Sequence, residues 1–352
     1  MPHVDELADR SVLAIDLGGT QIRAALITPD LAVHVRRAVP THDEDGVDAV
    51  VERICEVATG VLGDARAARL PPPVAVGVSA PGPLDPWRGV VTAPPNLAGW
   101  HDVPLGSRVA EAVGLPTFVE RDTNVAVLAE WRYGAARGAR TVIYVTVSTG
   151  IGGGLIIDER PLLGSDGTAG EIGHIVADID GPRCGCGRIG HVEAMASGTA
   201  IARDARALIE AGDSPRLAEL AAAGADVDAA LVARAADEGD SASAALLSRA
   251  WVIIGAMCAS LVNVLNPDVI VIGGSIAEHR PDLIDVARDE IERRAFEVPA
   301  TRVRVERAEL KDDVSLIGCL PIVAERLTDP AFGGGSHPLT QAATIEQGAL
   351  RP

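Results

Sequence analysis

The stretch VLAIDLGGTQ, from Val12 to Gln21, decides most about the fold of this chain. We expect an apolar strand that contains Asp16 near its end, then a turn, and then a second apolar strand. The turn consists of Gly18, Gly19 and Thr20. Adjacent glycines let backbone amides approach a phosphate, and a carboxylate at a strand end can hold Mg²⁺ beside it. The stretch therefore predicts either half of a nucleotide site or an ordinary tight hairpin.

A similar strand followed by a glycine turn recurs twice. Strand 141–147 runs into a turn predicted over 148–154, and strand 269–272 ends in a third turn. The residues that we assign to a nucleotide are Thr149, Gly150, Gly152 and Gly153 in the second turn, and Gly273 and Gly274 in the third. The two similar hairpins suggest an internal duplication whose halves clamp one nucleotide. The Rossmann spacing and the P-loop motif are both absent, so metal and amides would meet the phosphate charge.

Composition excludes several classes of protein. A chain of 352 residues exceeds the usual size of one core, so two domains are expected. The formal charge of −18 argues against partners such as nucleic acid or an anionic membrane surface. A small neutral or metal-chelated ligand fits this charge better.

Targeting signals and cysteine usage favour the cytoplasm. The first ten residues are polar and acidic and do not resemble an export signal. The longest apolar segment, 251–265, is shorter than the roughly 20 residues that a bilayer needs, and we expect a buried core helix there. Five cysteines in a chain of this size do not indicate a disulfide framework.

The order of strands and helices predicts an α/β fold. Strands over 12–17, 22–27, 33–39 and 74–79, with a helix over 46–66, form the pattern of an α/β half-domain. The proline- and glycine-rich segment 80–104 is a long loop of the kind that is often functional. Asp122 lies between a strand over 117–120 and a helix over 125–133, a junction where open α/β sheets bind ligands. Region 199–250 reads as a helical layer, and the last helix is expected over 313–327.

Four potential metal ligands lie close together in the sequence. They are His174, Cys184, Cys186 and His191, with several glycines between them. Two thiolates and two imidazoles suit a tetrahedral Zn²⁺ ion, and four protein ligands would make the site structural. The alternative is two free thiols beside two unrelated histidines.

Two carboxylates flank this zinc knuckle, Glu171 just before it and Glu193 just after it. Carboxylates accept paired hydrogen bonds from sugar hydroxyls, and folding of the knuckle would draw both toward one place. Solvated surface glutamates are the plainer interpretation, which the glycine-rich context and the nearby metal ligands disfavour.

Together, these motifs resemble the ROK family of sugar kinases and repressors, in the actin, Hsp70 and hexokinase-like ATPase superfamily. The resemblance runs from Val12 to about Leu327. It implies a two-lobed actin-like (ribonuclease H-like) fold with an active-site cleft between the lobes. We expect a smaller lobe over 1–120, a larger lobe over 121–327 whose last helix packs back on the first lobe, and a flexible tail over 328–352.

The resemblance also implies residue roles. Asp122 matches the catalytic base of the family, and Mg²⁺ of Mg·ATP would lie near Asp16. The residues that match sugar-binding positions are Gly82, Asn96, Asp122, Glu171, His174 and Glu193, with His174 also a ligand of the structural Zn²⁺. Family members commonly form dimers or tetramers, so a homodimer or homotetramer is expected.

Two positions depart from the family pattern. His191 replaces a usual cysteine, which keeps a zinc ligand. Arg121 replaces the usual asparagine before the catalytic aspartate, and arginine cannot accept a hydrogen bond. Either Arg121 points away from the sugar, or the sugar is recognised differently.

The sequence therefore predicts an ATP-dependent hexokinase that phosphorylates the 6-hydroxyl of its sugar, with glucose as the first candidate substrate. N-acetylglucosamine, N-acetylmannosamine and fructose are alternative acceptors. An alternative of a different class is a non-catalytic sugar-binding or sugar-responsive regulatory protein.

Overall fold

The computed structural model describes residues 10–332, which form two compact units. Unit 1 contains the described residues up to 132, residues 163–169 and those from 312 onward, and unit 2 contains residues 133–162 and 170–311. The predicted lobes divide the chain differently, at residue 120, and that division stays a prediction. Most of the predicted flexible tail, from residue 333, lies outside the described residues.

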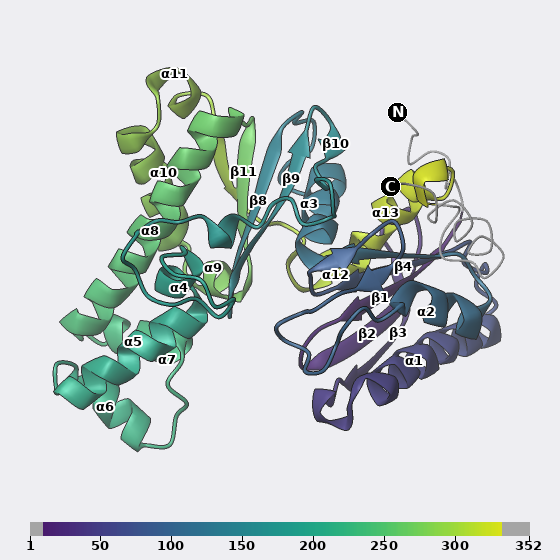
Figure 1. The fold of residues 1–352 in the computed structure, drawn as a ribbon, viewed down its shortest axis with the longest axis horizontal. Helices are drawn as coiled ribbons and strands as arrows, with labels where there is room; N and C mark the ends of the chain where they lie inside the picture. Colours follow the sequence, from purple (N-terminus) through teal and green to yellow (C-terminus); the bar gives the residue numbers. More distant parts are fainter. Residues whose placement is uncertain (1–9, 333–352) are drawn as a thin grey trace, which may run out of the picture. The chain divides into compact units, whose positions relative to one another are not determined.

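Unit 1 is built on a five-stranded mixed sheet with the order β3-β2-β1-β4-β7 (Figure 1). Its strands are β1 (Val12–Leu17), β2 (Gln21–Ile27), β3 (Val33–Pro40), β4 (Val76–Ala80) and β7 (Thr117–Arg121). β1 pairs antiparallel with β2 and parallel with β4, and β4 pairs parallel with β7. Every residue of β1, β4 and β7 is buried, as is typical of parallel strands that are covered on both faces.

Helices cover the sheet of unit 1. The helices of this unit are α1 (Val47–Ala67), α2 (Leu105–Val113), α3 (Asp122–Tyr133), α12 (Val314–Ile317) and α13 (Cys319–Arg326), with the 3₁₀ turns η2 (Asp43–Asp45), η4 (Lys311–Asp313) and η5 (Pro330–Phe332). α1 packs on β2 and β3, whereas α13 packs on β1, β4 and β7. The single helix predicted over 313–327 is two helices separated at Gly318. The predicted loop 80–104 contains two short paired strands, β5 (Leu84–Asp85) and β6 (Val90–Val91).

Unit 2 repeats the sheet topology of unit 1, with the order β10-β9-β8-β11-β12. Its strands are β8 (Val142–Val147), β9 (Ile151–Ile157), β10 (Arg160–Pro161), β11 (Val269–Gly273) and β12 (Arg304–Arg307). The first three strands pair antiparallel, and β8, β11 and β12 pair parallel, in the senses found in unit 1. This repetition agrees with the internal duplication that the two glycine hairpins suggest.

The helical layer expected over 199–250 is present in unit 2. The helices of this unit are α4 (Glu193–Ala196), α5 (Gly198–Ala211), α6 (Pro215–Ala222), α7 (Ala229–Asp237), α8 (Ser241–Leu265), α9 (Ser275–His279), α10 (Asp282–Arg294) and α11 (Glu297–Ala300), with the 3₁₀ turn η3 (Ile172–His174). The side chains of Ser197, Asp228 and Asp240 accept hydrogen bonds from the first turns of α5, α7 and α8. Such caps satisfy amides that a helix leaves unpaired and fix where each helix begins.

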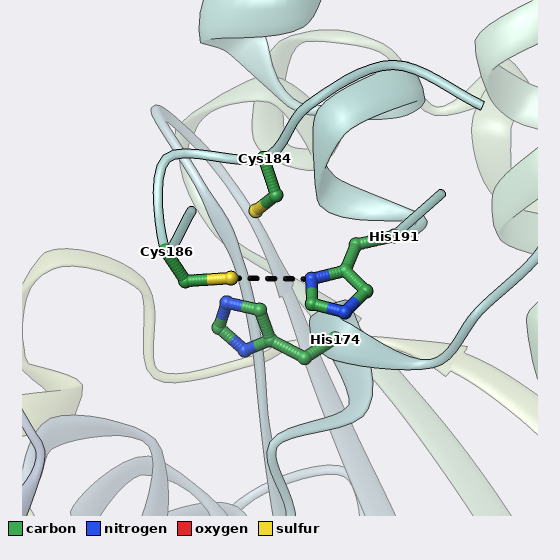
Figure 2. Close-up of side chains that lie close together, drawn as sticks. All are labelled: His174, Cys184, Cys186 and His191. Carbon is green, nitrogen blue, oxygen red and sulfur yellow. Dashed lines mark hydrogen bonds between the residues drawn. The ribbon is translucent and has the colours of Figure 1, made fainter. Parts of the chain in front are cut away.

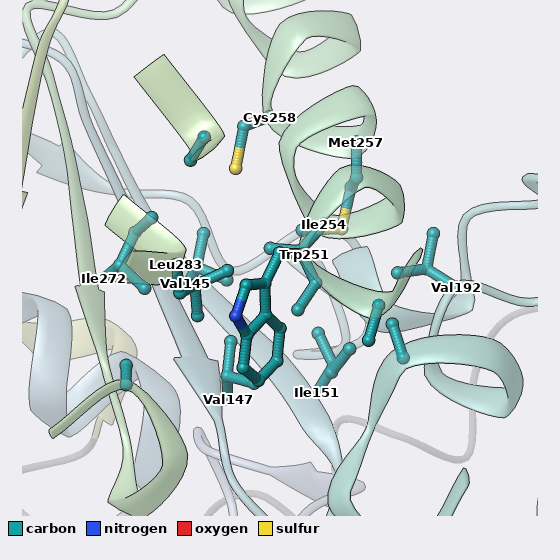
Figure 3. Close-up of a cluster of buried hydrophobic side chains, with 14 of the residues drawn as sticks. Val145, Val147, Ile151, Val192, Trp251, Ile254, Met257, Cys258, Ile272 and Leu283 are labelled. Atoms are coloured by element: carbon teal, nitrogen blue, oxygen red, sulfur yellow. The ribbon is translucent and has the colours of Figure 1, made fainter. Parts of the chain in front are cut away.

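Helix α8 lies in the core of unit 2. It is long and apolar enough to span a bilayer by length and composition, a test that core helices also pass. Trp251 and Ile254 are buried and pack with Val145 and Ile272 of the sheet (Figure 3). The prediction of a buried core helix is therefore confirmed, although the helix begins ten residues earlier than the apolar segment.

Candidate functional site

The first glycine turn joins β1 to β2 and brings Asp16 beside the guanidinium of Arg23. Register places Asp16 opposite Arg23 of β2, and Arg23 donates from Nε and Nη2 to Asp16 Oδ2 at 2.9 and 2.6 Å. The turn closes through a hydrogen bond from Gly18 N to Gln21 O at 3.0 Å. The sequence analysis missed Arg23, although its position after the turn mirrors that of Asp16 before it.

Several predicted residues of unit 1 meet at one edge of its sheet. β1, β4 and β7 are parallel neighbours, so their carboxyl ends lie together. This edge carries Asp16, the segment that contains Gly82, and Asp122. Asn96 reaches the same region, because a methyl group on Gly19 would lie 3.5 Å from Asn96 O.

Asp122 lies at the strand–helix junction that the sequence predicts. It is the first residue of α3, directly after β7, and its Oδ1 accepts a hydrogen bond from Thr123 N at 2.7 Å. The helix begins at Asp122 and not at 125, so the carboxylate is at the positive end of the helix dipole.

Arg121 is buried beside this aspartate, with 4% of its surface exposed. Its Nη2 donates to the carbonyl oxygen of Ala169 and, at 3.2 Å, to Asn124 Oδ1. A methyl group on Gly82 would lie 2.7 Å from Arg121 Cδ, so the glycine makes room for this side chain. The guanidinium therefore lies inside unit 1 and is directed at the chain segment around Ala169.

The second glycine turn, in unit 2, is shorter than predicted. β9 begins at Ile151, so only Ser148, Thr149 and Gly150 turn the chain. The prediction that the turn runs to residue 154 was wrong, because glycines 152–154 pair with β8 as strand residues. The assignment of Gly152 and Gly153 to a nucleotide stays a prediction.

The third glycine turn lies against the second. β11 runs parallel to β8, and Gly273 is its last residue. Ser148 Oγ and Ser275 Oγ are 2.8 Å apart, and a methyl group on Gly274 would lie 2.6 Å from Val147 O. The predicted nucleotide residues of unit 2 therefore converge. The sequence analysis missed the two serines, which stand directly beside the predicted glycines.

The four predicted metal ligands also converge, all within unit 2 (Figure 2). One ligand atom from each of His174, Cys184, Cys186 and His191 lies within 4.8 Å of the others. The His174 and His191 rings meet edge to face with centroids 4.9 Å apart, and Cys186 Sγ is 3.3 Å from His191 Nδ1. Burial raises the pKa of the Cys184 thiol to about 11, so a metal would have to displace its proton.

Glu171 and Glu193 both reach this cluster. Glu171 Oε2 is 3.2 Å from His174 Nδ1, and Glu193 Oε1 is 3.8 Å from His174 Nε2. The hydrogen bond between His174 Nδ1 and the Glu171 carboxylate is the main cause that raises the pKa of His174. The structure thus brings together Glu171, His174 and Glu193, as the sequence predicts.

Glu193 also contacts the second glycine turn. Its Oε2 accepts a hydrogen bond from Ile151 N at 3.0 Å, and its Oε1 accepts one from Cys184 Sγ at 3.4 Å. One carboxylate therefore joins the predicted zinc knuckle to the predicted phosphate turn.

Comparisons with known proteins identify the family of this chain. The model of the ROK family matches residues 12–326. The glucokinase of Thermotoga maritima is 31% identical over 316 residues, which cover 90% of this chain and 98% of that protein. The N-acetylmannosamine kinase of Salmonella newport is 31% identical over 309 residues, which cover 88% of this chain and 96% of that protein.

Solved structures share the fold. A ROK family glucokinase from Streptomyces griseus, in complex with glucose and AMPPNP, matches with a TM-score of 0.75 and 30% identity, and covers 88% of this chain and 98% of its own. A ROK family transcriptional regulator, a homologue of the E. coli MLC protein, matches with a TM-score of 0.80 and 25% identity, and covers 96% of this chain and 81% of its own.

Proposed function

This chain belongs to the ROK family and is an ATP-dependent sugar kinase, and we propose that it transfers the γ-phosphoryl group of Mg·ATP to the 6-hydroxyl of a hexose, with glucose preferred. The observation that carries the proposal is the position of Asp122, at the sheet edge that also holds Asp16 and its glycine turn. The two mixed sheets are consistent with an actin-like ATPase fold.

Asp122 would act as the base in this reaction. Phosphoryl transfer requires an aligned acceptor and neutralised charge, and a carboxylate orients the hydroxyl and takes its proton. Its place at the start of α3 fixes the carboxylate, because Oδ1 accepts a hydrogen bond from Thr123 N.

Phosphates of ATP would be held by backbone amides and metal. In the proposal, the amides of the Gly18–Thr20 turn, of Thr149 and Gly150, and of the third turn contact the nucleotide. Asp16 fits Mg²⁺, because both bonds from Arg23 go to Oδ2 and Oδ1 is then the oxygen for the ion or its water. Bound Mg²⁺ would neutralise charge that develops on the transferred phosphate.

The sugar would be bound by carboxylates and an imidazole. In unit 2, His174 lies 3.2 Å from Glu171 Oε2 and 3.8 Å from Glu193 Oε1. Gly82 and Asn96 of unit 1 are the other residues proposed to bind sugar. The relatives include a glucokinase and an N-acetylmannosamine kinase, so N-acetylated hexoses and fructose stand as alternative acceptors.

We also propose a structural Zn²⁺ ion at the knuckle. The chemistry of the donor set fits, since two sulfur and two nitrogen atoms gather within a space suited to tetrahedral coordination. The ion would fix the orientation of His174, whose other ring nitrogen would then face the sugar.

Zinc analysis of Cys184→Ala tests this second proposal. The variant should lose about one zinc per chain and bind sugar more weakly, while Cys55→Ala, a thiol of unit 1, should keep both properties. Full zinc content or unchanged sugar affinity in Cys184→Ala would contradict the role given to the metal.

A coupled ADP-release assay tests the reaction. Purified protein with Mg·ATP should turn over one sugar from a panel of glucose, mannose, fructose, N-acetylglucosamine and N-acetylmannosamine. Asp122→Asn should remove most turnover but leave sugar affinity largely intact, and Asp64→Asn, which changes an exposed aspartate of unit 1, should behave as wild type. Near-normal turnover in Asp122→Asn would refute the assignment of the base.

If no sugar in the panel is turned over but calorimetry shows sugar binding, the alternative of a non-catalytic regulatory protein is supported. The similarity to the transcriptional regulator is the observation behind this alternative. The proposal also places the enzyme in the cytoplasm as a homodimer or homotetramer, which light scattering would test.

A further inference from the structure

Residues 163–169 belong to unit 1, although the chain on both sides of them belongs to unit 2. The segment closes on itself through a hydrogen bond from Ala169 N to Leu163 O at 3.0 Å. Thr168 further stabilises it, since its N and Oγ1 donate to Asp166 Oδ1 at 3.2 and 2.6 Å. The segment is therefore an ordered excursion of the chain.

Two contacts attach this segment to unit 1. A methyl group on Gly167 would lie 2.5 Å from Pro86 Cδ and 2.7 Å from Leu84 O, so the backbone there packs closely on the strand pair β5–β6. The second contact is the hydrogen bond from Arg121 Nη2 to the carbonyl oxygen of Ala169.

The direction of the Arg121 side chain is fixed by a buried network. Its Nη2 also donates to Asn124 Oδ1, and Asn124 Nδ2 donates to Glu120 Oε1 at 2.9 Å. Glu120 in turn pairs with Arg326 of α13. Because these groups are buried, their hydrogen bonds hold the guanidinium in place beside the Ala169 carbonyl.

After Ala169 the chain enters unit 2 at once. A methyl group on Gly153 of β9 would lie 3.0 Å from Gly170 O and 2.5 Å from Ile172 Cδ1, so both residues pack on that strand. Along the chain, Glu171 therefore lies between two fixed residues. Ala169 is held by Arg121, and Ile172 packs on β9.

We propose that Arg121 is a positioning residue for sugar recognition: it holds the Ala169 carbonyl and thereby fixes the backbone that carries Glu171. The inference rests on the proposed function, in which Glu171 binds the sugar. An asparagine at position 121 has a shorter side chain and would not reach the Ala169 carbonyl as the arginine does.

Steady-state kinetics of Arg121→Met in the full chain test the proposal. Loss of a hydrogen bond from a charged donor should raise the KM for the hexose about tenfold or more, with the KM for ATP unchanged and kcat less affected. Arg121→Lys should recover part of the loss. Arg132→Met is the matched control, since Arg132 lies on α3 but pairs with Glu325, and a merely structural loss would lower apparent kcat without raising KM.

Hydrogen exchange supplies a readout that needs no turnover. Amides of residues 163–174 should exchange faster in Arg121→Met than in wild type, with α8 unchanged. If Arg121→Met does not fold, Gly167→Ala serves instead, because it disturbs the other attachment of the same segment and should raise the hexose KM likewise. A wild-type hexose KM together with unchanged exchange would overturn the proposal. If the wild type phosphorylates no hexose, the proposed function fails, and the exchange comparison still decides whether Arg121 anchors the segment.

Discussion

Replacing Arg326 by methionine removes the cationic half of an ion pair that lies inside unit 1. Glu120 is 0% exposed and Arg326 is 3% exposed, and the two side chains pair directly. Arg326 Nη1 also donates to Val119 O at 3.1 Å, and its guanidinium lies 4.3 Å from the centre of the Phe332 ring. The pair joins α13, near the end of the described chain, to the strand that carries Arg121.

The expected cost follows from this burial. Removing one partner of a buried pair leaves an uncompensated charge, which typically costs about 3–5 kcal/mol. For a domain of this size, each kcal/mol lowers the melting temperature by about 2–4 °C, so Arg326→Met should melt about 10 °C or more below wild type. The double variant Glu120→Gln/Arg326→Met removes both charges and should recover part of the loss.

Differential scanning calorimetry of the full chain at pH 7 measures this effect. Arg36→Met is the matched control, because Arg36 pairs with Asp313 in the same unit but their side chains are 41% and 37% exposed. Exposed pairs contribute about 0–1 kcal/mol, so the control should melt within about 3 °C of wild type. Equal shifts in Arg326→Met and Arg36→Met would refute the reasoning.

Two further predictions concern packing and pH. Gly77→Ala should destabilise unit 1 by about 1–3 kcal/mol, because the added methyl group would lie 2.6 Å from Cys319 Cβ. Gly63→Ala on α1 is the control and should be neutral or stabilising, because no atom lies within 4 Å of the added methyl group. Equal midpoints of urea unfolding for the two variants would contradict this prediction. Burial raises the pKa of the Cys258 and Cys319 thiols to about 12 from an ordinary 9.0, so the folded state keeps protons that the unfolded state releases. The contribution of these thiols to the free energy of unfolding should be complete below about pH 9 and fall as the pH rises toward 12. If the free energy of unfolding of a Cys258→Ala/Cys319→Ala variant depends on pH as that of wild type does, this prediction is wrong.

Local patterns in the sequence predicted the strands and the metal cluster well. Apolar runs that end in glycine turns mark β1 and β8, because buried strands need continuous apolar residues and tight turns need small ones. The knuckle ligands converge because only a few residues separate Cys184, Cys186 and His191. Asp122 was placed correctly at its junction, since a strand ends and a helix begins there.

Features that depend on distant parts of the chain escaped prediction. Glu120 and Arg326 are 206 positions apart, and no local pattern indicates that a buried glutamate will meet that arginine. The acceptors of Arg121 were not predicted, because one of them is the backbone carbonyl of Ala169, and every residue type supplies such a carbonyl. The extent of β9 was underestimated because glycines 152–154 favour a turn locally, whereas pairing with β8 decides their conformation.

The sheet of unit 1 takes its strands from the first part of the chain, but α12 and α13, which cover one side of it, come from residues after 313. During synthesis on the ribosome, the strand that carries Glu120 emerges long before Arg326 exists. Unit 2, whose described segments end at residue 311, can complete its core while unit 1 still lacks these helices. Unit 1 is therefore begun first but completed after unit 2, and the surface around Glu120 and Gly77 stays uncovered until α13 has been synthesised.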